Sequence, residues 1–289
     1  MEELGDVDRR LAYLTTFFKG YRAVNVTPDV IARYVAKRQA ETTQMIASRE
    51  GETVTRRLTS NRTINLELAL LRRMFRLAAR RRKVLSVPAF EMLKESAPRA
   101  GFFEEGQYRA VVKRLPEDLQ AAVAIAYTFG WRVRSEVLPL ERRQLDLKTG
   151  TRRLEPGTTK TREGRGVYLT PELRALLADQ LERVEGLQKK LGRIVPQLFP
   201  HLDGPHCGAP RRGFRKAWKA ACRDAGVPGR ILHDFRRTAV RNMERAGVPR
   251  SVAMKLTGHK TEAVYRRYAI VSDVDLQAAA QRLAQLSAQ

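Results

Sequence analysis

The chain has 289 residues, 43% of them hydrophobic, so it is long enough to bury one large core or two modest ones. Its 55 lysines and arginines against 31 aspartates and glutamates give a formal net charge of +24, which indicates a polyanionic partner such as nucleic acid. The absence of a long apolar run, of a signal-peptide core near Met1 and of a C-x-x-C pair argues against a membrane-spanning or secreted disulfide-rich protein and favours the cytoplasm.

The first third of the sequence predicts a small helical domain. A first helix is expected over residues 8–18, and Thr27, Pro28 and Asp29 form a typical helix start of N-cap, first-turn proline and first-turn acid. The polar stretch 41–62 predicts an exposed connection. A longer helix is expected to begin near Thr63, because apolar residues recur there at helical spacing.

Four arginines lie mainly on the other faces of this longer helix. For any one of them, a solvated helix surface is the simpler interpretation. Together they run into a further basic stretch at residues 81–83, and they fit a DNA-facing edge equally well. The four are Arg72, Arg73, Arg76 and Arg80.

Pro88 and the segment 96–101, which contains a further proline and a glycine, interrupt regular structure and predict a domain boundary. The predicted domains are residues 1–97 and 98–289. The sequence as a whole predicts a mainly α fold with a small β-sheet, of the α+β class, in which an all-helical first domain precedes the second. The second domain is expected to begin with helices near 104–115 and 116–129, followed by a turn at 146–150 and a hairpin of residues 151–155 and 165–169. Thr170 is expected to open the next helix. From about Arg211 to the end the chain is expected to be helical, with breaks at 226–229, Gly247 and Gly258.

Three short stretches carry the chemically active side chains of this second domain. The first, residues 130–136, follows an apolar helix and contains Arg132 and Glu136. The second contains His233 and Arg236, and the third is Gly258-His259 with Tyr268 nine residues after the histidine. Lys160 lies between the first two stretches, on the expected hairpin.

This inventory suits phosphodiester chemistry without a metal. Guanidinium groups can clamp the oxygens of a phosphoryl group, imidazoles can donate or accept a proton near neutral pH, and a lysine can protonate a departing oxygen. A tyrosine hydroxyl can act as a covalent nucleophile. No paired-carboxylate metal site accompanies these residues, so we expect neither a metal nor another cofactor.

In their order along the chain, these motifs resemble those of the tyrosine recombinase (phage integrase) family, and the match covers nearly the whole sequence. The resemblance implies a helical core-binding domain followed by a catalytic domain. It implies that Tyr268 is the nucleophile and that Arg132 and Arg236 bind the scissile phosphate. By the same resemblance, His233 assists proton transfer and His259 hydrogen-bonds the phosphate. Lys160 would be the general acid, and Glu136 would support the site.

The implied function is site-specific recombination of double-stranded DNA at attachment-like sites, as in the integration of a viral genome or mobile element, through a 3′-phosphotyrosyl intermediate. The resemblance also implies a homotetramer on DNA. Its subunits would be linked by a C-terminal helix beginning near Ser272 with an apolar stripe. Host or phage DNA-bending and directionality factors are further expected partners, and the N-terminal arm-binding domain of many such integrases is expected to be missing.

Several alternatives remain open at the level of sequence. The family usually places the acidic residue three positions after the first arginine, whereas here Arg132 and Glu136 are four apart, so Arg134 competes with Arg132. Tyr265 competes with Tyr268, although it follows His259 by only six residues. A type IB topoisomerase-like activity and a DNA-binding protein that no longer cuts are the alternative functions.

Other basic residues near the motifs are expected to contact the DNA backbone or to be solvated. Arg162 and Arg165 lie on the hairpin, and Arg237 should point away from its neighbour Arg236, toward an ion pair or the DNA surface. The remaining histidines, His201 and His206, fall in a loop whose spacing to the cysteines matches no standard zinc pattern. We expect loop histidines and no metal site.

Overall fold

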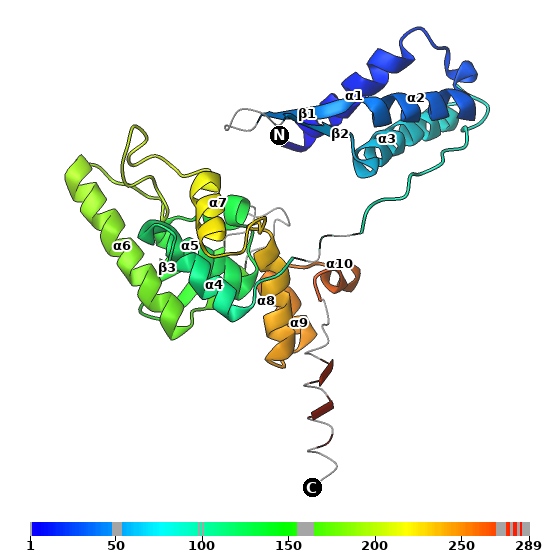
Figure 1. The fold of residues 1–289 in the computed structure, drawn as a ribbon. Helices are drawn as coiled ribbons and strands as arrows, with labels where there is room; N and C mark the ends of the chain where they lie inside the picture. Colours follow the sequence, from blue (N-terminus) through cyan, green and yellow to red (C-terminus); the bar gives the residue numbers. More distant parts are fainter. Residues whose placement is uncertain are drawn as a thin grey trace. The chain divides into compact units, whose positions relative to one another are not determined.

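The computed structural model describes residues 2–47, 54–97, 99, 101–154, 165–269 and, in the tail, 276, 277, 280, 281 and 284. The chain divides into two compact units, residues 1–99 and 100–289 (Figure 1). The mainly α fold with a small β-sheet is confirmed. Within the described part of the chain, no helix combines the length and the apolar character that crossing a bilayer requires.

The first unit is built on three helices. They are α1 (Glu2–Phe18), α2 (Pro28–Ala40) and α3 (Asn61–Arg80). The predicted start of α2 is confirmed: the side chain of Thr27 accepts a hydrogen bond from the backbone of Val30, and Pro28 occupies the first turn. Helix α3 begins slightly earlier than expected, because Ser60 rather than Thr63 is its N-cap.

Helix α3 separates its apolar and basic residues onto different faces. Leu68, Leu71 and Phe75 are buried, and they pack with residues of α1 and α2 such as Leu14 and Tyr34. The opposite surface is basic and solvent-exposed; its arginines are Arg72, Arg73, Arg76 and Arg80.

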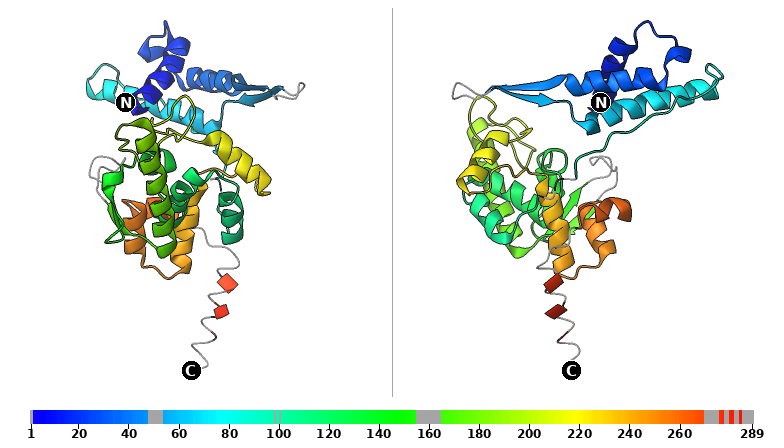
Figure 2. Two further views of the ribbon diagram at one scale, coloured as in Figure 1. Left: turned by 90° about the vertical axis from the view of Figure 1, so that its left-hand side faces the viewer. Right: turned by 45° about the vertical axis from the view of Figure 1, so that its right-hand side comes forward.

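One part of the first unit differs from the prediction of an all-helical domain. Strand β1 (Thr42–Ala47) pairs antiparallel with β2 (Val54–Leu58), in the stretch expected to be an exposed connection (Figure 2). The two strands contain threonine, valine and isoleucine, which favour extended backbone. The strands were not predicted because they also contain many polar residues, and a hairpin without regular alternation of apolar and polar residues resembles a loop in sequence.

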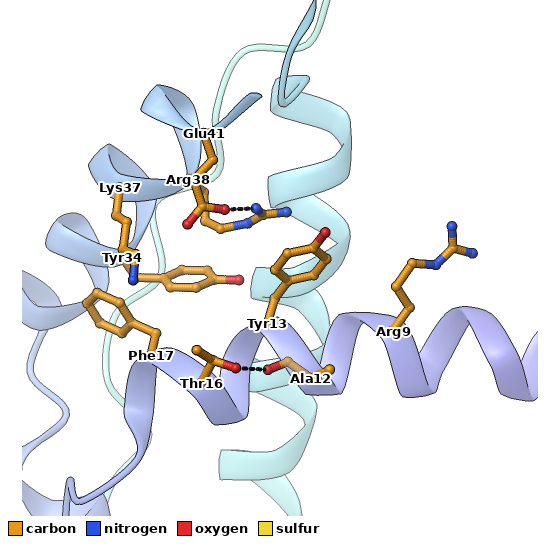
Figure 3. Close-up of a pocket in the computed structure, with 9 residues that line it drawn as sticks. All are labelled: Arg9, Ala12, Tyr13, Thr16, Phe17, Tyr34, Lys37, Arg38 and Glu41. Carbon is orange, nitrogen blue, oxygen red and sulfur yellow. Dashed lines mark hydrogen bonds and ion pairs between the residues drawn. The ribbon is translucent and has the colours of Figure 1, made fainter. Parts of the chain in front are cut away.

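A buried ion pair fixes α2 to α3 in the first unit. Arg38 Nη2 lies 2.7 Å from Glu67 Oε1, and both side chains are almost fully buried. The hydroxyl of Tyr34 donates to Glu67 at 2.7 Å, and the Arg38 guanidinium stacks 3.8 Å above the ring centre of Tyr13. These residues line or adjoin a cavity of about 380 Å³ between α1 and α2, where Arg38 also bonds Glu41 (Figure 3).

Replacing Glu67 with glutamine should destabilise the first unit, by up to about 3–5 kcal/mol, because it removes the buried partner of Arg38 and leaves only the more exposed carboxylate of Glu41 beside that charge. Both tryptophans of the chain, Trp131 and Trp218, lie in the second unit, so hydrogen exchange of peptides from α2 and α3 is the appropriate measurement. The control is Glu91→Gln, which alters an exposed carboxylate in the segment that follows α3. Equal protection in the two variants would contradict a structural role for the ion pair.

The second unit surrounds the apolar helix α5 (Glu117–Phe129), which packs against α6 (Pro171–Leu191) and α8 (Asp234–Arg245) (Figure 2). Its other helices are α4 (Glu105–Val112), α7 (Arg215–Asp224), α9 (Arg250–Thr257) and α10 (Glu262–Arg266). A three-stranded antiparallel sheet, in the order β3-β4-β5, contains β3 (Leu145–Asp146), β4 (Thr151–Leu154) and β5 (Arg165–Tyr168). The core of the unit includes residues 121–126 of α5.

Most predicted elements of the second unit are confirmed. Strands β4 and β5 form the expected hairpin, and its intervening turn at 158–164 lies outside the described residues. The expected breaks in the last third fall at glycines with left-handed backbone, including Gly247 and Gly258. The predicted C-terminal helix from Ser272 lies largely outside the described residues, of which 276, 277, 280, 281 and 284 are helical.

Candidate active site

Five of the six residues that the sequence identified as catalytic meet where several helices begin or end. Arg132 follows α5, His233 and Arg236 belong to the start of α8, His259 follows α9, and Tyr268 follows α10. Helices α8, α9 and α10 lie side by side (Figure 2). The sixth residue, Lys160, lies outside the described residues, as does Arg162, and Arg165 is the first residue of β5.

The turn after α5 brings the backbone into the site. Gly130 ends the helix with a positive φ of 68°, and its carbonyl accepts a hydrogen bond from Arg236 Nη1 at 2.8 Å. A Cβ at this position would lie 3.1 Å from the Cβ of Ala239 on α8. The left-handed backbone conformation therefore favours glycine, and a side chain here would also force α8 to shift slightly.

The next residue, Trp131, ties this turn to the end of α9. Its indole Nε1 donates to the carbonyl of Leu256 at 2.8 Å, and the side chain is almost fully buried. This role of Trp131 has no local signal in the sequence, because its hydrogen-bond partner lies 125 residues away in the chain. By joining the two chain segments that precede Arg132 and His259, Trp131 helps to hold these residues at one place.

The extra residue between Arg132 and Glu136 is accommodated by a π-helical turn at Val133–Val137. Val137 N donates to Arg132 O, five residues back, at 3.1 Å. The carboxylate of Glu136, buried, accepts from both Arg132 N at 2.8 Å and Arg132 Nη1 at 2.9 Å. The side chain of Arg134 is exposed. This geometry favours Arg132 over Arg134 as the first arginine of the site.

Arg236 is the most enclosed cation of the site. Its side chain is buried, and its guanidinium donates to Gly130 O and, through Nε, to His259 Nε2 at 3.0 Å. Its Cζ lies 5.6 Å from the ring centre of Tyr268. The arginine is thus held in one orientation beside the tyrosine, as a rigid fork that can bind an anion bidentately.

Tyr268 is positioned for proton transfer, whereas Tyr265 is not. The Tyr268 hydroxyl lies 3.4 Å from His233 Nε2, and its ring centre lies 4.9 Å from that of His259. Tyr268 is half-buried, but Tyr265 is fully buried and packs edge-on against His259 at 5.5 Å. Of the two tyrosines, only Tyr268 offers its hydroxyl to a substrate.

The environment of His233 favours its neutral form. Desolvation of the imidazole lowers the pKa of His233 below its ordinary value of 6.5, and the positive charges of Arg236, Arg237 and Arg132 lower it further. Near neutral pH the ring is therefore uncharged, which is the form that can accept a proton from the neighbouring Tyr268.

Arg237 forms an ion pair, as predicted, but it does not point away from the site, contrary to the other part of the prediction. Its Cζ lies 5.8 Å from the ring centre of Tyr268, and its Nη1 lies 3.5 Å from the buried carboxylate of Asp234. The Nε of Arg237 is buried and has no hydrogen-bond partner among the described residues. The missed signal was helical spacing, because residues three and four positions after His233 share its face of α8.

The two histidines outside the motifs remain apart from this site. His201 and His206 lie in the loop before α7, with ring centres 5.8 Å apart. Desolvation by burial lowers the pKa of His201. Among the described residues, no group of three or more histidines, cysteines or acidic residues is arranged to hold a metal ion.

Comparison with known proteins places this arrangement in a family. The model of the phage integrase family matches residues 102–274. The integrase of Salmonella phage P22 is 27% identical over 206 residues, which are 70% of this chain and 52% of that protein, so the chain spans about half the length of this curated relative.

Solved structures share the fold at low sequence identity. The integrase of transposon Tn1549 in complex with transposon right end DNA aligns with a TM-score of 0.71 at 15% identity, over 98% of this chain and 94% of that one. A lambda integrase dimer bound to a COC′ core site aligns with a TM-score of 0.65 at 15% identity, over 93% and 89%. A lambda integrase tetramer bound to a Holliday junction aligns with a TM-score of 0.64 at 14% identity, over 93% and 72%.

Proposed function

The chain belongs to the phage integrase family, and on that premise we propose that it is a site-specific DNA recombinase that breaks and rejoins strands through Tyr268. The observation that carries the proposal is the Tyr268 hydroxyl, 3.4 Å from His233 Nε2, on a ring whose centre lies 5.6 Å from Cζ of Arg236. A nucleophile, a proton acceptor and a phosphate clamp are the parts that metal-independent strand cleavage requires.

In the proposed first step, the Tyr268 oxygen attacks a phosphodiester and His233 accepts its proton. A bond forms between the phenolic oxygen and phosphorus, and the bond to the 5′ oxygen breaks, leaving a 3′-phosphotyrosyl link and a 5′-hydroxyl. Arg236 and Arg132 stabilise the charge on the non-bridging oxygens. Lys160 protonates the departing oxygen, and attack by a 5′-hydroxyl of another strand reverses these events.

The preferred test of this function is covalent trapping. DNA sites would be selected from a random-sequence duplex pool by binding to the protein, and a nick would then be placed within the selected site so that the cleaved end diffuses away. We expect an adduct that survives detergent and forms in EDTA without ATP. Strict dependence on a divalent metal, or no adduct with any selected site, would contradict the proposal. Relaxation of supercoiled plasmid by the monomer, without recombinant products, would point to the topoisomerase-like alternative.

The proposed substrate is double-stranded DNA, handled by a homotetramer with DNA-bending and directionality factors as accessory partners. Such a substrate would place the protein with the nucleoid in the cytoplasm. The exposed basic face of α3 and the net charge of +24 support a DNA partner.

Linkage of subunits through the C-terminal segment predicts that truncation after Ser272 weakens assembly on DNA while sparing binding to a single site.

Neutralising the basic face of α3 should weaken DNA binding and flatten its salt dependence. Each phosphate contact contributes about 0.9 to the slope of log K against log salt, so the substitution of four contacting arginines by glutamine lowers the slope by about 3–4. Fluorescence anisotropy at several salt concentrations measures this slope. The variant combines Arg72→Gln, Arg73→Gln, Arg76→Gln and Arg80→Gln.

The control removes two positive charges from another surface, and its effect is compared per charge removed. Lys189 and Lys190 are exposed in the last turn of α6, and their substitution by glutamine should change the slope much less. An unchanged slope in the α3 variant would instead assign its arginines to a solvated surface.

The lowered pKa of His233 predicts the pH dependence of strand cleavage. Since neutral His233 accepts the proton, the rate should rise with pH through the pKa of His233, with its midpoint below pH 6.5. Arg237→Gln removes one of the positive charges that lower this pKa, so the midpoint should move to higher pH. Single-turnover adduct formation measures the profile.

The comparison variant for this profile is His233→Gln. It should cleave slowly and lose the titration below pH 6.5 altogether. A titration that persists in His233→Gln would assign the midpoint to another group.

A further inference from the structure

A chain of hydrogen bonds runs from the end of α9 into the site. Thr257 Oγ1 lies 2.8 Å from Ala253 O and 2.7 Å from His259 Nδ1. His259 Nε2 in turn lies 3.0 Å from Arg236 Nε. The three side chains are buried: Thr257 is 0% exposed, Arg236 2% and His259 7%. In such an enclosed place the donor and the acceptor of each bond have to match.

The chemistry of the two ends sets the direction of every bond. Guanidinium nitrogens only donate, so His259 Nε2 accepts from Arg236 with its lone pair and carries no proton. A carbonyl only accepts, so the single hydroxyl hydrogen of Thr257 points to Ala253 O. The hydroxyl oxygen of Thr257 is then the acceptor for His259, whose Nδ1 must carry the proton.

We propose that Thr257 is a positioning residue of the active site that selects the Nδ1–H tautomer of His259, and that this tautomer orients Arg236. In the DNA-free protein, His259 therefore acts first on the guanidinium. Direct donation from His259 Nε2 to a phosphate requires a proton that this tautomer does not hold. The effect of these hydrogen bonds between Thr257, His259 and Arg236 on strand cleavage rests on the proposed function. The assignment of the tautomer is independent of that function.

Loss of the Thr257 hydroxyl should remove the preference of His259 for the Nδ1–H tautomer. With valine at position 257, His259 Nδ1–H faces no acceptor at that position, and the Nε2–H tautomer becomes competitive. An Nε2–H would point at the Nε–H of Arg236, so the hydrogen bond between them would be lost. Serine keeps the hydroxyl and should keep the tautomer, which makes Thr257→Ser the matched control for Thr257→Val.

The direct measurement is ¹⁵N NMR of histidine-labelled protein without DNA. In the wild type and in Thr257→Ser, His259 should give a protonated Nδ1 and an unprotonated Nε2, whereas Thr257→Val should shift the ring toward the opposite tautomer. The spectrum of His259→Gln identifies the resonances among the four histidines of the chain. A protonated Nε2 in the wild type, or identical ring resonances in all Thr257 variants, would overturn the proposal.

Single-turnover adduct formation connects the tautomer to the reaction. A hydrogen bond of about 1–1.5 kcal/mol corresponds to a rate loss of roughly five- to tenfold in Thr257→Val, with DNA affinity unchanged and Thr257→Ser near the wild type. In a His259→Gln background the substitution should cause no further loss, whereas a general structural defect would persist there. An equal loss in both backgrounds would contradict the effect of these hydrogen bonds on cleavage. If no DNA gave an adduct in the wild type while the NMR result held, the proposed function would fail and the tautomer assignment would stand.

Discussion

Replacing Tyr268 with phenylalanine should abolish covalent attachment to DNA and leave DNA binding unchanged. The substitution removes one oxygen, the atom that would bond to phosphorus, and keeps the ring that packs beside His259 and Arg236. Without that oxygen no phosphotyrosyl bond can form, so the expected loss is complete rather than partial. Electrophoresis of trapped adducts measures attachment, and anisotropy with the intact duplex measures binding.

The matched control is Tyr265→Phe, three residues away. Because Tyr265 is fully buried, its hydroxyl cannot reach a substrate, and this variant should form adducts at nearly the wild-type rate. Adducts that persist in Tyr268→Phe and vanish in Tyr265→Phe would reverse the assignment.

Replacing Arg236 with lysine should slow strand cleavage by about a hundred- to a thousandfold, the usual cost of removing a donor that stabilises transition-state charge. Lysine keeps the charge, but a single ammonium cannot reproduce the planar guanidinium that reaches Gly130 O and His259 Nε2 together. The expected defect therefore lies in the chemical step and not in DNA affinity. Single-turnover adduct formation at saturating protein separates the two.

Arg212→Lys provides the comparison, since Arg212 is exposed before α7 and lies outside the site. It should retain the wild-type rate. A loss of less than about tenfold in Arg236→Lys would show that the buried arginine has a structural role and that another cation binds the phosphate.

The elements that could be predicted from sequence have local causes. The starts of α2 and α6 follow from Thr27 and Thr170, each a threonine N-cap directly before a proline, and in both the side chain accepts a backbone hydrogen bond. The turn after α5 follows from Gly130, which tolerates the positive φ. Such signals lie within a few residues of the structure that they determine.

The features that could not be predicted depend on partners far apart in the chain. Strands β1 and β2 stabilise each other by pairing. The amino-acid composition of each strand alone is only a weak indication of β structure. Trp131 finds its acceptor 125 residues away. The motifs predicted five of the residues that meet at the site, but not that Arg237 would join them or that Thr257 would determine the proton on His259. Those contacts depend on how α8 and α9 pack.

The π turn at Val133–Val137 also shows how this chain accommodates a longer interval between two motif residues. It absorbs one additional residue within a single turn, while the backbone nitrogen and the guanidinium of Arg132 both stay in contact with Glu136. An insertion at this point therefore changes the interval between two motif residues and preserves their bond. The bond between Arg132 and Glu136 therefore does not require the usual interval of three positions, and a sequence pattern that permits one additional residue between them still finds the pair.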